Sequence, residues 1–253
     1  MCRLFGAKSR GPVYYDLFEE FADLAETGNT SSGHPDARGH RDGWGLVLFR
    51  NGRLEAHARG AGSAKEDPRY AQAAWEIAKR NADRRSDERL IVLGHIRRAS
   101  EGMPVGTEWS HPFVEARDGR TWAFAHNGGI DHFPFQTDVG LIDSQRLFRM
   151  LLGNLDGAAP DAVAAAVRTT VDAVRREFDG YSGLNLLFTD GERLYAFREF
   201  SKQADYYTLF YDDFGEAVVV CSQPLLTMRG NAIEKGSLIA VGPDLAVTSK
   251  HVL

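Results

Sequence analysis

The chain has 253 residues, of which 43% are hydrophobic and 26% are charged, and its formal net charge is −5. These values are typical of a globular protein with a large core, and we predict one domain over residues 1–253. The net negative charge excludes a basic surface for nucleic acid or for an anionic membrane. The sequence contains no run of about 18 apolar residues, so we expect no membrane-spanning helix.

The cysteines and the N-terminus favour a cytoplasmic protein. Cys2 and Cys221 are the 2 cysteines of the chain, and they do not make a disulfide framework. Residues 1–8 lack the apolar core of a signal peptide. Neither a CxxC nor an HExxH pattern occurs, and we expect no metal and no cofactor. Cys221 follows an apolar run and is predicted to be an inert core thiol.

Apolar spacing predicts helices and strands in a mixed order along the chain. Helical spacing predicts helices over 16–27, 67–82, 143–152 and 160–178. Apolar runs between turn signals predict strands over 2–8, 43–50, 53–59, 90–97, 122–126, 184–189, 193–198, 206–211, 217–221, 237–241 and 246–249. The strand over 90–97 is apolar throughout, which indicates burial on both faces. Residues 28–42 and 101–119 are predicted to be polar loops.

The order of these elements favours antiparallel sheets. A parallel sheet alternates strands and helices more strictly, whereas this chain has an Asn51-Gly52 hairpin signal and a late run of strands. We therefore predict an α+β fold, a four-layer αββα sandwich in which helices face two antiparallel sheets.

The pair Met1-Cys2 suggests a nucleophile at the start of the chain. Removal of Met1 would leave Cys2 with a thiol and a free α-amine on the same carbon. The pKa of an α-amine is about 8 and that of a thiol about 8.5, so the two groups can exchange a proton near neutral pH. A thiol beside its own base is an activated nucleophile. The alternative is that Cys2 occupies this position by chance.

Two charged side chains are candidates for substrate binding. Arg97 ends the buried strand over 90–97, where a guanidinium is costly unless it is paired. It can grip a substrate carboxylate through two hydrogen bonds, or form a structural ion pair. Asp143 can bind a substrate ammonium, or it can cap the helix over 143–152, where Ser144 is the other candidate cap.

His126-Asn127-Gly128 follows a predicted strand. The Asn127 amide and the Gly128 backbone N–H can both point at a developing oxyanion, as an acyl-transfer site requires. Glycine allows close approach of the backbone. The alternative is a plain turn that breaks the strand at Asn127.

Taken together in this order, these segments resemble the class II glutamine amidotransferases, which are N-terminal nucleophile hydrolases, and in particular their stand-alone, single-domain members. The residues that carry the resemblance are Met1-Cys2, Asp42-Gly43-Trp44-Gly45, Gly94-His95-Ile96-Arg97-Arg98-Ala99-Ser100, His111-Pro112-Phe113, Ala125-His126-Asn127-Gly128, Asp143-Ser144-Gln145 and Ser222-Gln223-Pro224-Leu225. The resemblance therefore spans nearly the whole chain. One departure is Arg98, where large members of the family often carry Trp.

The resemblance implies a role for each residue of the set. Cys2 would be the nucleophile and its α-amine the general base, while Asn127 and Gly128 would form the oxyanion hole. The substrate site would consist of Arg97 for the α-carboxylate of glutamine, Asp143 for its α-ammonium, Ser100 as a further hydrogen-bond partner of the carboxylate, and His126 beside them.

The implied reaction is hydrolysis of the glutamine side-chain amide through a Cys2 thioester, which releases ammonia and glutamate. One alternative is hydrolysis of a larger γ-glutamyl amide, for which the loops over 28–42 and 101–119 would form a wider pocket. Another is a catalytically silent module that senses glutamine or supports a partner. An ammonia-accepting partner protein is a further possibility, and the sequence predicts no oligomeric state.

Overall fold

A computed structural model describes residues 2–30, 39–82, 88–133, 140–225 and 228–253. Its helices are α1 (Tyr15–Thr27), α2 (Pro68–Ala82), α3 (Asp143–Gly153) and α4 (Pro160–Glu177), with a 3₁₀ turn, η1, at Thr107–Trp109. No helix in these described ranges is long and apolar enough to cross a membrane.

The strands form two sheets in which every pairing is antiparallel. The seven-stranded sheet has, in spatial order, the strands β11 (Asn231–Ala232), β9 (Phe210–Asp213), β10 (Ala217–Cys221), β1 (Arg3–Ser9), β4 (Leu90–Arg97), β2 (Gly43–Arg50) and β3 (Arg53–Gly60). The six-stranded sheet has, in spatial order, the strands β13 (Val247–His251), β12 (Ser237–Val241), β8 (Leu194–Arg198), β7 (Tyr181–Thr189), β6 (Arg120–Ile130) and β5 (Phe113–Arg117).

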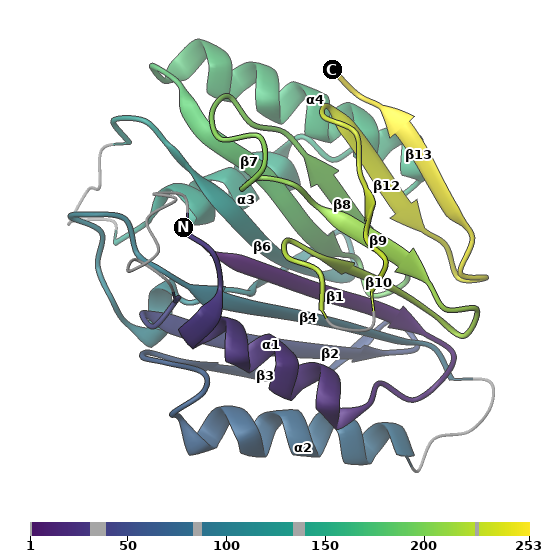
Figure 1. Cartoon of the computed structure of the whole chain (residues 1–253). Helices are drawn as coiled ribbons and strands as arrows, with labels where there is room; N and C mark the ends of the chain where they lie inside the picture. The colour runs from purple at the N-terminus through teal and green to yellow at the C-terminus, as the bar shows by residue number, and fades with distance from the viewer. Residues whose placement is uncertain (1, 31–38, 83–87, 134–139, 226–227) are drawn as a thin grey trace.

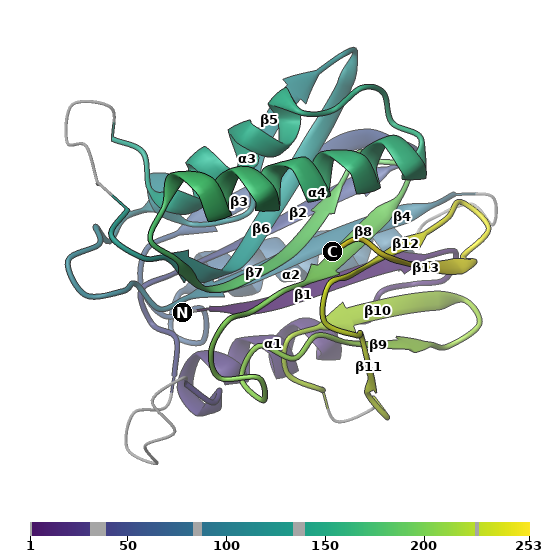
Figure 2. The same ribbon diagram turned by 90° about the horizontal axis from the view of Figure 1, so that it is seen from above.

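Four layers result from the packing of helices on the outer face of each sheet (Figure 1). One apolar cluster joins α1 and α2 to the seven-stranded sheet, and another joins α3 and α4 to the six-stranded sheet. A third cluster lies between the sheets. Figure 2 shows the strands of the two sheets crossing one another. The predicted αββα sandwich is confirmed.

Strands β1 and β4 are apolar on both faces because both faces are covered. In β1, Leu4 belongs to the cluster between the sheets, whereas Phe5 belongs to the cluster under the helices. In β4, Leu93 and Val92 divide in the same way. The alternation of side chains along a strand therefore sends successive residues into different cores.

The structure corrects two predictions around the six-stranded sheet. The predicted loop over 101–119 contains η1 and strand β5, which pairs with β6. The predicted break at Asn127 is wrong, because β6 continues to Ile130 and pairs Asn127 with Asn185 and Gly128 with Leu184. These pairings satisfy the backbone within the sheet, so no turn forms there.

Smaller differences concern helix and strand ends. The predicted caps of α3 are wrong, because Ile142 is the N-cap and Asp143 is the first helical residue. The strand predicted over 206–211 is β9, which begins only at Phe210. Strand β11 was not predicted. Of the predicted loop over 28–42, residues 31–38 lie outside the described residues.

Candidate active site

Cys2 lies directly before β1, and groups from distant parts of the chain hold it. Its backbone N–H donates to Asn127 Oδ1 at 2.9 Å, and its carbonyl accepts from the Tyr206 hydroxyl at 3.2 Å. Its Sγ lies 3.9 Å from the Arg98 carbonyl oxygen. The side chain is 8% exposed. Residues from β6 and from the segment before β9 thus fix the start of β1.

Cys2 opens into a cavity of about 500 Å³. The cavity brings together most of the residues predicted from the sequence, namely Cys2, Arg97, Ser100, His126, Gly128 and Asp143. Asn127 lies behind its wall, where it is fully buried and contacts Cys2. Segments more than 100 residues apart in the sequence therefore meet at one end of the sandwich.

Arg97 ends β4 with a side chain that is only 3% exposed. Its Nη1 donates to the Pro104 carbonyl at 2.7 Å. Among the described residues, no carboxylate lies within 4.0 Å of its guanidinium, so the structural ion pair considered above does not form there. The remaining donors of a guanidinium fork are suited to a substrate carboxylate.

The turn after Arg97 is fixed by Asp42, whose Oδ2 accepts the Ala99 backbone N–H at 2.8 Å. The Asp42 N–H in turn donates to the Arg97 carbonyl at 2.9 Å. Ser100 follows this turn, is exposed and lines the cavity. Its hydroxyl is therefore accessible to a ligand.

Asp143 faces the cavity from the first turn of α3. Its Oδ2 accepts the Ile130 N–H at 3.1 Å, and its Oδ1 accepts the Ser144 N–H at 2.7 Å. A carboxylate accepts several hydrogen bonds, and the N-terminal end of a helix favours an anion. The carboxylate is thus fixed in position and still borders the cavity.

Asn127 and Gly128 are held by their pairing with β7. A Cβ on Gly128 would lie 1.8 Å from the Gly183 carbonyl oxygen, so only glycine allows the two strands this close. Within the described part of the chain, Asn127 Nδ2 is buried without a hydrogen-bond partner. An unsatisfied buried donor costs about 1–3 kcal/mol, and an oxyanion would satisfy it.

His126 is buried with both ring nitrogens engaged by the protein. Nε2 lies 3.1 Å from the Gly183 carbonyl and Nδ1 lies 2.9 Å from Ser144 Oγ. Because a carbonyl only accepts, Nε2 carries a proton. Nδ1 pairs with the Ser144 hydroxyl, which also lies within donating distance of Asp143 Oδ1 at 3.3 Å. Burial lowers the pKa of His126, although the Asp143 carboxylate opposes this shift. Neither nitrogen is free to bind a substrate in this arrangement.

Sequence reasoning assigned no role to several residues at the site. His95 and His111 are buried with ring centroids 4.1 Å apart, and His111 lines the cavity. Burial lowers the pKa of both imidazoles well below the usual value, so both are neutral. The sequence segments that contain His95 and His111 are among those that carry the family resemblance, whereas no sequence pattern pointed to Tyr206.

Cys221 lies apart from this cavity in β10. It is fully buried, and burial raises the pKa of its thiol to about 12. The predicted inert core thiol is consistent with this position. The described residues contain no group of three or more His, Cys, Asp or Glu side chains that could hold a metal ion.

The fold is that of the N-terminal nucleophile hydrolases, the class in which two antiparallel sheets lie between helices. It is similar to glutamine phosphoribosylpyrophosphate amidotransferase from B. subtilis, with a TM-score of 0.63 and 14% identity over 100% of this chain and 49% of that one. It is also similar to a glutamine aminotransferase class-II domain protein from Silicibacter pomeroyi, with a TM-score of 0.63 and 19% identity over 99% of each chain.

Residues 1–240 match the sequence profile of the class-II glutamine amidotransferases, and the chain belongs to this family. It is 29% identical over 205 residues to "Putative glutamine amidotransferase YafJ" of Escherichia coli (strain K12), which covers 78% of this chain and 72% of that one. The chain spans about half the length of two other curated relatives, 46% of one from Haemophilus influenzae and 51% of one from Methanocaldococcus jannaschii.

Proposed function

We propose that this protein hydrolyses the side-chain amide of glutamine with Cys2 as the nucleophile. The observation that carries the proposal is the meeting of Cys2, a buried Arg97 and the Asp143 carboxylate in one cavity. Glutamine has a carboxylate, an ammonium and a remote amide, and these three groups complement a cation, an anion and a thiol. Membership of the family supports the same reaction class.

The proposed first step uses the α-amine that removal of Met1 would expose. The N atom of Cys2 lies 2.9 Å from Asn127 Oδ1, which would orient this amine. The amine takes the thiol proton, and Sγ attacks the side-chain amide carbon of glutamine. The carbonyl oxygen becomes an oxyanion, which accepts hydrogen bonds from Asn127 Nδ2 and the Gly128 N–H.

The tetrahedral intermediate then collapses to a γ-glutamyl thioester. The protonated amine gives its proton to the amide nitrogen, which leaves as ammonia. A water molecule attacks the thioester carbon and gives a proton to the amine. The C–S bond breaks, the proton returns to Sγ, and glutamate is released with Cys2 regenerated.

Arg97 and Asp143 would hold the other end of the substrate. Arg97 would bind the α-carboxylate and Asp143 the α-ammonium, with the Ser100 hydroxyl as an additional donor to the carboxylate. His126 would act through Ser144 and Gly183, to which its ring is bonded, by fixing the wall of the cavity.

A second candidate is hydrolysis of a larger γ-glutamyl amide. The cavity volume of about 500 Å³ favours it, because pockets of about 300–1,000 Å³ hold drug-sized ligands. Glu101 and Met103, from the predicted loop over 101–119, line the same cavity. The leaving group would then be a substituted amine in place of ammonia.

The test is glutamate release from protein whose Met1 is shown by intact mass to be removed. We expect glutamate release from glutamine or from a γ-glutamyl anilide. In Cys2→Ala the rate should fall on the order of 1,000-fold or more, because the nucleophile is gone, as it does when a member of a catalytic triad is removed. Cys221→Ala is the matched control and should retain activity. Equal rates in Cys2→Ala and wild type would overturn the proposal, and the preferred substrate would separate the two candidates.

The proposal also covers the location of the enzyme and the fate of its ammonia. We place the enzyme in the cytoplasm as one domain, and its ammonia would pass to a partner protein if the reaction serves a synthesis. A module that only senses glutamine would instead be stabilised by glutamine without turnover in the same assay.

A further inference from the structure

A second cavity lies at the opposite end of β1 from Cys2. Lys8 lies six positions after Cys2, which corresponds to about 20 Å along a strand. The cavity has a volume of about 430 Å³ and is lined by Lys8, Asn51, Gly52, Arg89, Gly191, Glu192 and Pro243. A neighbouring hollow of about 540 Å³ shares Asn51, Gly52 and Glu192.

Turns from both sheets build this end of the molecule. Asn51 and Gly52 form the β2–β3 turn of one sheet, and Gly191 lies in the β7–β8 turn of the other. A Cβ on Gly191 would lie 2.6 Å from the Gly52 carbonyl oxygen, and its φ of +86° also favours glycine. The two turns are therefore in contact, and a ligand here would touch both sheets.

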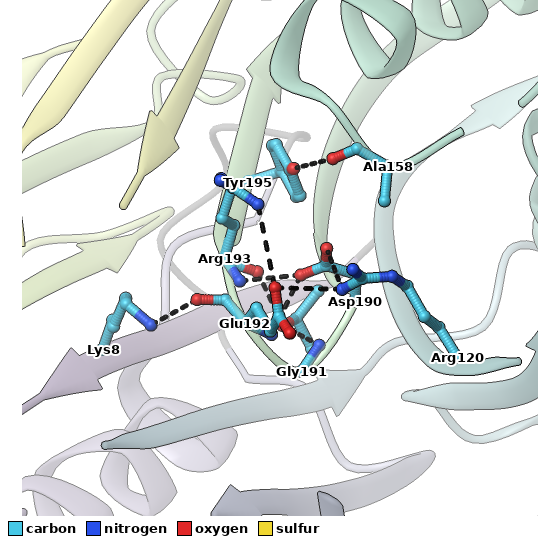
Figure 3. A network of polar contacts seen from close by, with 9 residues as sticks. Lys8, Arg120, Ala158, Asp190, Gly191, Glu192, Arg193 and Tyr195 are labelled. Atoms are coloured by element: carbon cyan, nitrogen blue, oxygen red, sulfur yellow. Dashed lines mark hydrogen bonds and ion pairs between the residues drawn. The ribbon is translucent and has the colours of Figure 1, made fainter. Parts of the chain in front are cut away.

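Lys8 is the unusual residue of this cavity. It is only 1% exposed, and its Nζ donates to the Glu192 carbonyl oxygen at 2.6 Å (Figure 3). An ammonium has three donors, and one of them is used here. No carboxylate of the described residues lies within 4.0 Å of Nζ. A buried cation without an adjacent anion is costly, and an anion in the cavity would reduce this cost.

The nearby carboxylates are already neutralised by other cations. Asp190 lies 3.3 Å from Arg120 and accepts the backbone N–H groups of Glu192 and Arg193 at 3.0 and 2.7 Å. The Glu192 carboxylate lies 3.1 Å from Arg120 and 4.0 Å from Arg193. Figure 3 shows Arg120 and Asp190 together on the side of this network away from Lys8.

Among the described residues, neither Lys8 nor Arg89 forms an ion pair with a carboxylate within 4.0 Å, and the Asp190 and Glu192 carboxylates act on Lys8 only from a longer distance. The exposed Arg89 side chain lines the same cavity as the buried Lys8. One cation at the rim and another at the floor provide the charges that an oxyanion requires.

We propose that this cavity binds a small oxyanion, a phosphate or carboxylate group, with Lys8 and Arg89 as its cationic ligands. The site is separate from the Cys2 cavity and does not depend on the proposed reaction. Inorganic phosphate is a suitable probe for a phosphate ligand, and acetate is a suitable probe for a carboxylate ligand.

The protonation of Lys8 predicts how binding depends on pH. Burial lowers the pKa of Lys8 to about 8; the Arg89 and Arg193 guanidinium groups also lower it, while the Asp190 and Glu192 carboxylates raise it. Below pH 8 the ammonium is charged and attracts an anion. Above pH 8 it loses its proton, so affinity should fall as the pH rises from 7 to 9.5.

The experiment measures phosphate and acetate binding to the full chain by calorimetry, and the thermal unfolding midpoint, at pH 7 and pH 9.5. We expect one of the anions to bind at pH 7 and to raise the midpoint. Removal of a charged hydrogen-bond partner should weaken binding about tenfold or more in Lys8→Met and in Arg89→Ala. The exposed Lys79→Ala is the matched control and should bind as wild type does.

Sodium chloride at the same ionic strength separates specific binding from general screening. Absence of binding by both anions would overturn the proposal, and so would equal binding by wild type and Arg89→Ala. Arg89 is exposed, so this second variant decides the question even if Lys8→Met does not fold.

Discussion

Tyr206 contacts Cys2 directly although it does not line the cavity. Its hydroxyl donates to the Cys2 carbonyl, and the Arg3 guanidinium lies 4.5 Å from its ring centroid. Arg3 is itself fixed, because its Nη1 donates to the Ser222 carbonyl at 2.8 Å. Burial raises the pKa of Tyr206, so its hydroxyl stays a donor at neutral pH. We infer that Tyr206 is a positioning residue for Cys2, the proposed nucleophile.

Tyr206→Phe removes this hydrogen bond, which is worth about 0.5–1.5 kcal/mol, so we expect kcat to fall about three- to tenfold. KM should stay within about twofold, because Tyr206 does not line the cavity. Steady-state kinetics measures both. Tyr70→Phe is the matched control, since it removes a buried hydroxyl bonded to the Phe18 carbonyl in another layer. Equal loss of kcat in both variants would contradict a positioning role.

At the scale of elements, the course of β6 determines where the proposed oxyanion donors lie. Because β6 continues past Asn127, the Asn127 amide is held by strand pairing and lies beside the N atom of Cys2. A flexible turn would not fix the amide in this way. The same pairing requires glycine at position 128, where Gly183 comes too close for a side chain.

Gly128→Ala would push the backbone away from β7 and displace both proposed oxyanion donors. Loss of one such donor costs on the order of 10²–10³ in rate, and we expect kcat to fall by at least 100-fold. Gly153→Ala is the matched control, because a Cβ there would meet nothing within 4 Å. Kinetics and circular dichroism together check the result. A folded Gly128→Ala variant with wild-type kcat would argue against the oxyanion role.

At the scale of the whole molecule, β1 runs from the Cys2 cavity at one end to the Lys8 cavity at the other, and one of its faces packs between the two sheets. Leu4, Gly6 and Lys8 alternate toward this layer, while Phe5 and Ala7 pack under the helices. A Cβ on Gly6 would lie 2.9 Å from Leu187 Cδ2 of the opposite sheet. The two sheets are therefore closely packed beside position 6 of the strand that follows Cys2.

Gly6→Val should destabilise the protein by about 1–3 kcal/mol, because the added methyl groups overpack the interface between the sheets. The measurement is the free energy of unfolding in denaturant. Leu187→Ala opens space opposite position 6, so the double variant should be more stable than the sum of the single effects predicts. Additive effects would show that the two residues do not share a packing constraint.

The sequence by itself determined most of the elements and the set of candidate residues. Apolar runs predicted β2 and β4 closely, and the Asn51-Gly52 signal predicted β3 as the return strand, because these signals are local properties. The mixed segment over 2–8 was also predicted as a strand and forms β1. Hairpins also indicated the antiparallel sandwich. The chemistry of each of Cys2, Arg97 and Asn127-Gly128 allowed an alternative role, and the resemblance to the family joined the candidate residues into one set.

Only the tertiary structure decided what surrounds those residues. The local sequence predicted a turn at Asn127-Gly128, because strand β7, which holds this pair in the sheet, lies more than 50 residues away in the sequence. Tyr206 and the buried Lys8 had no sequence signal for the same reason. Their contacts come from packing between distant segments, and the cost of burying a charge depends on that packing and not on the neighbours in sequence.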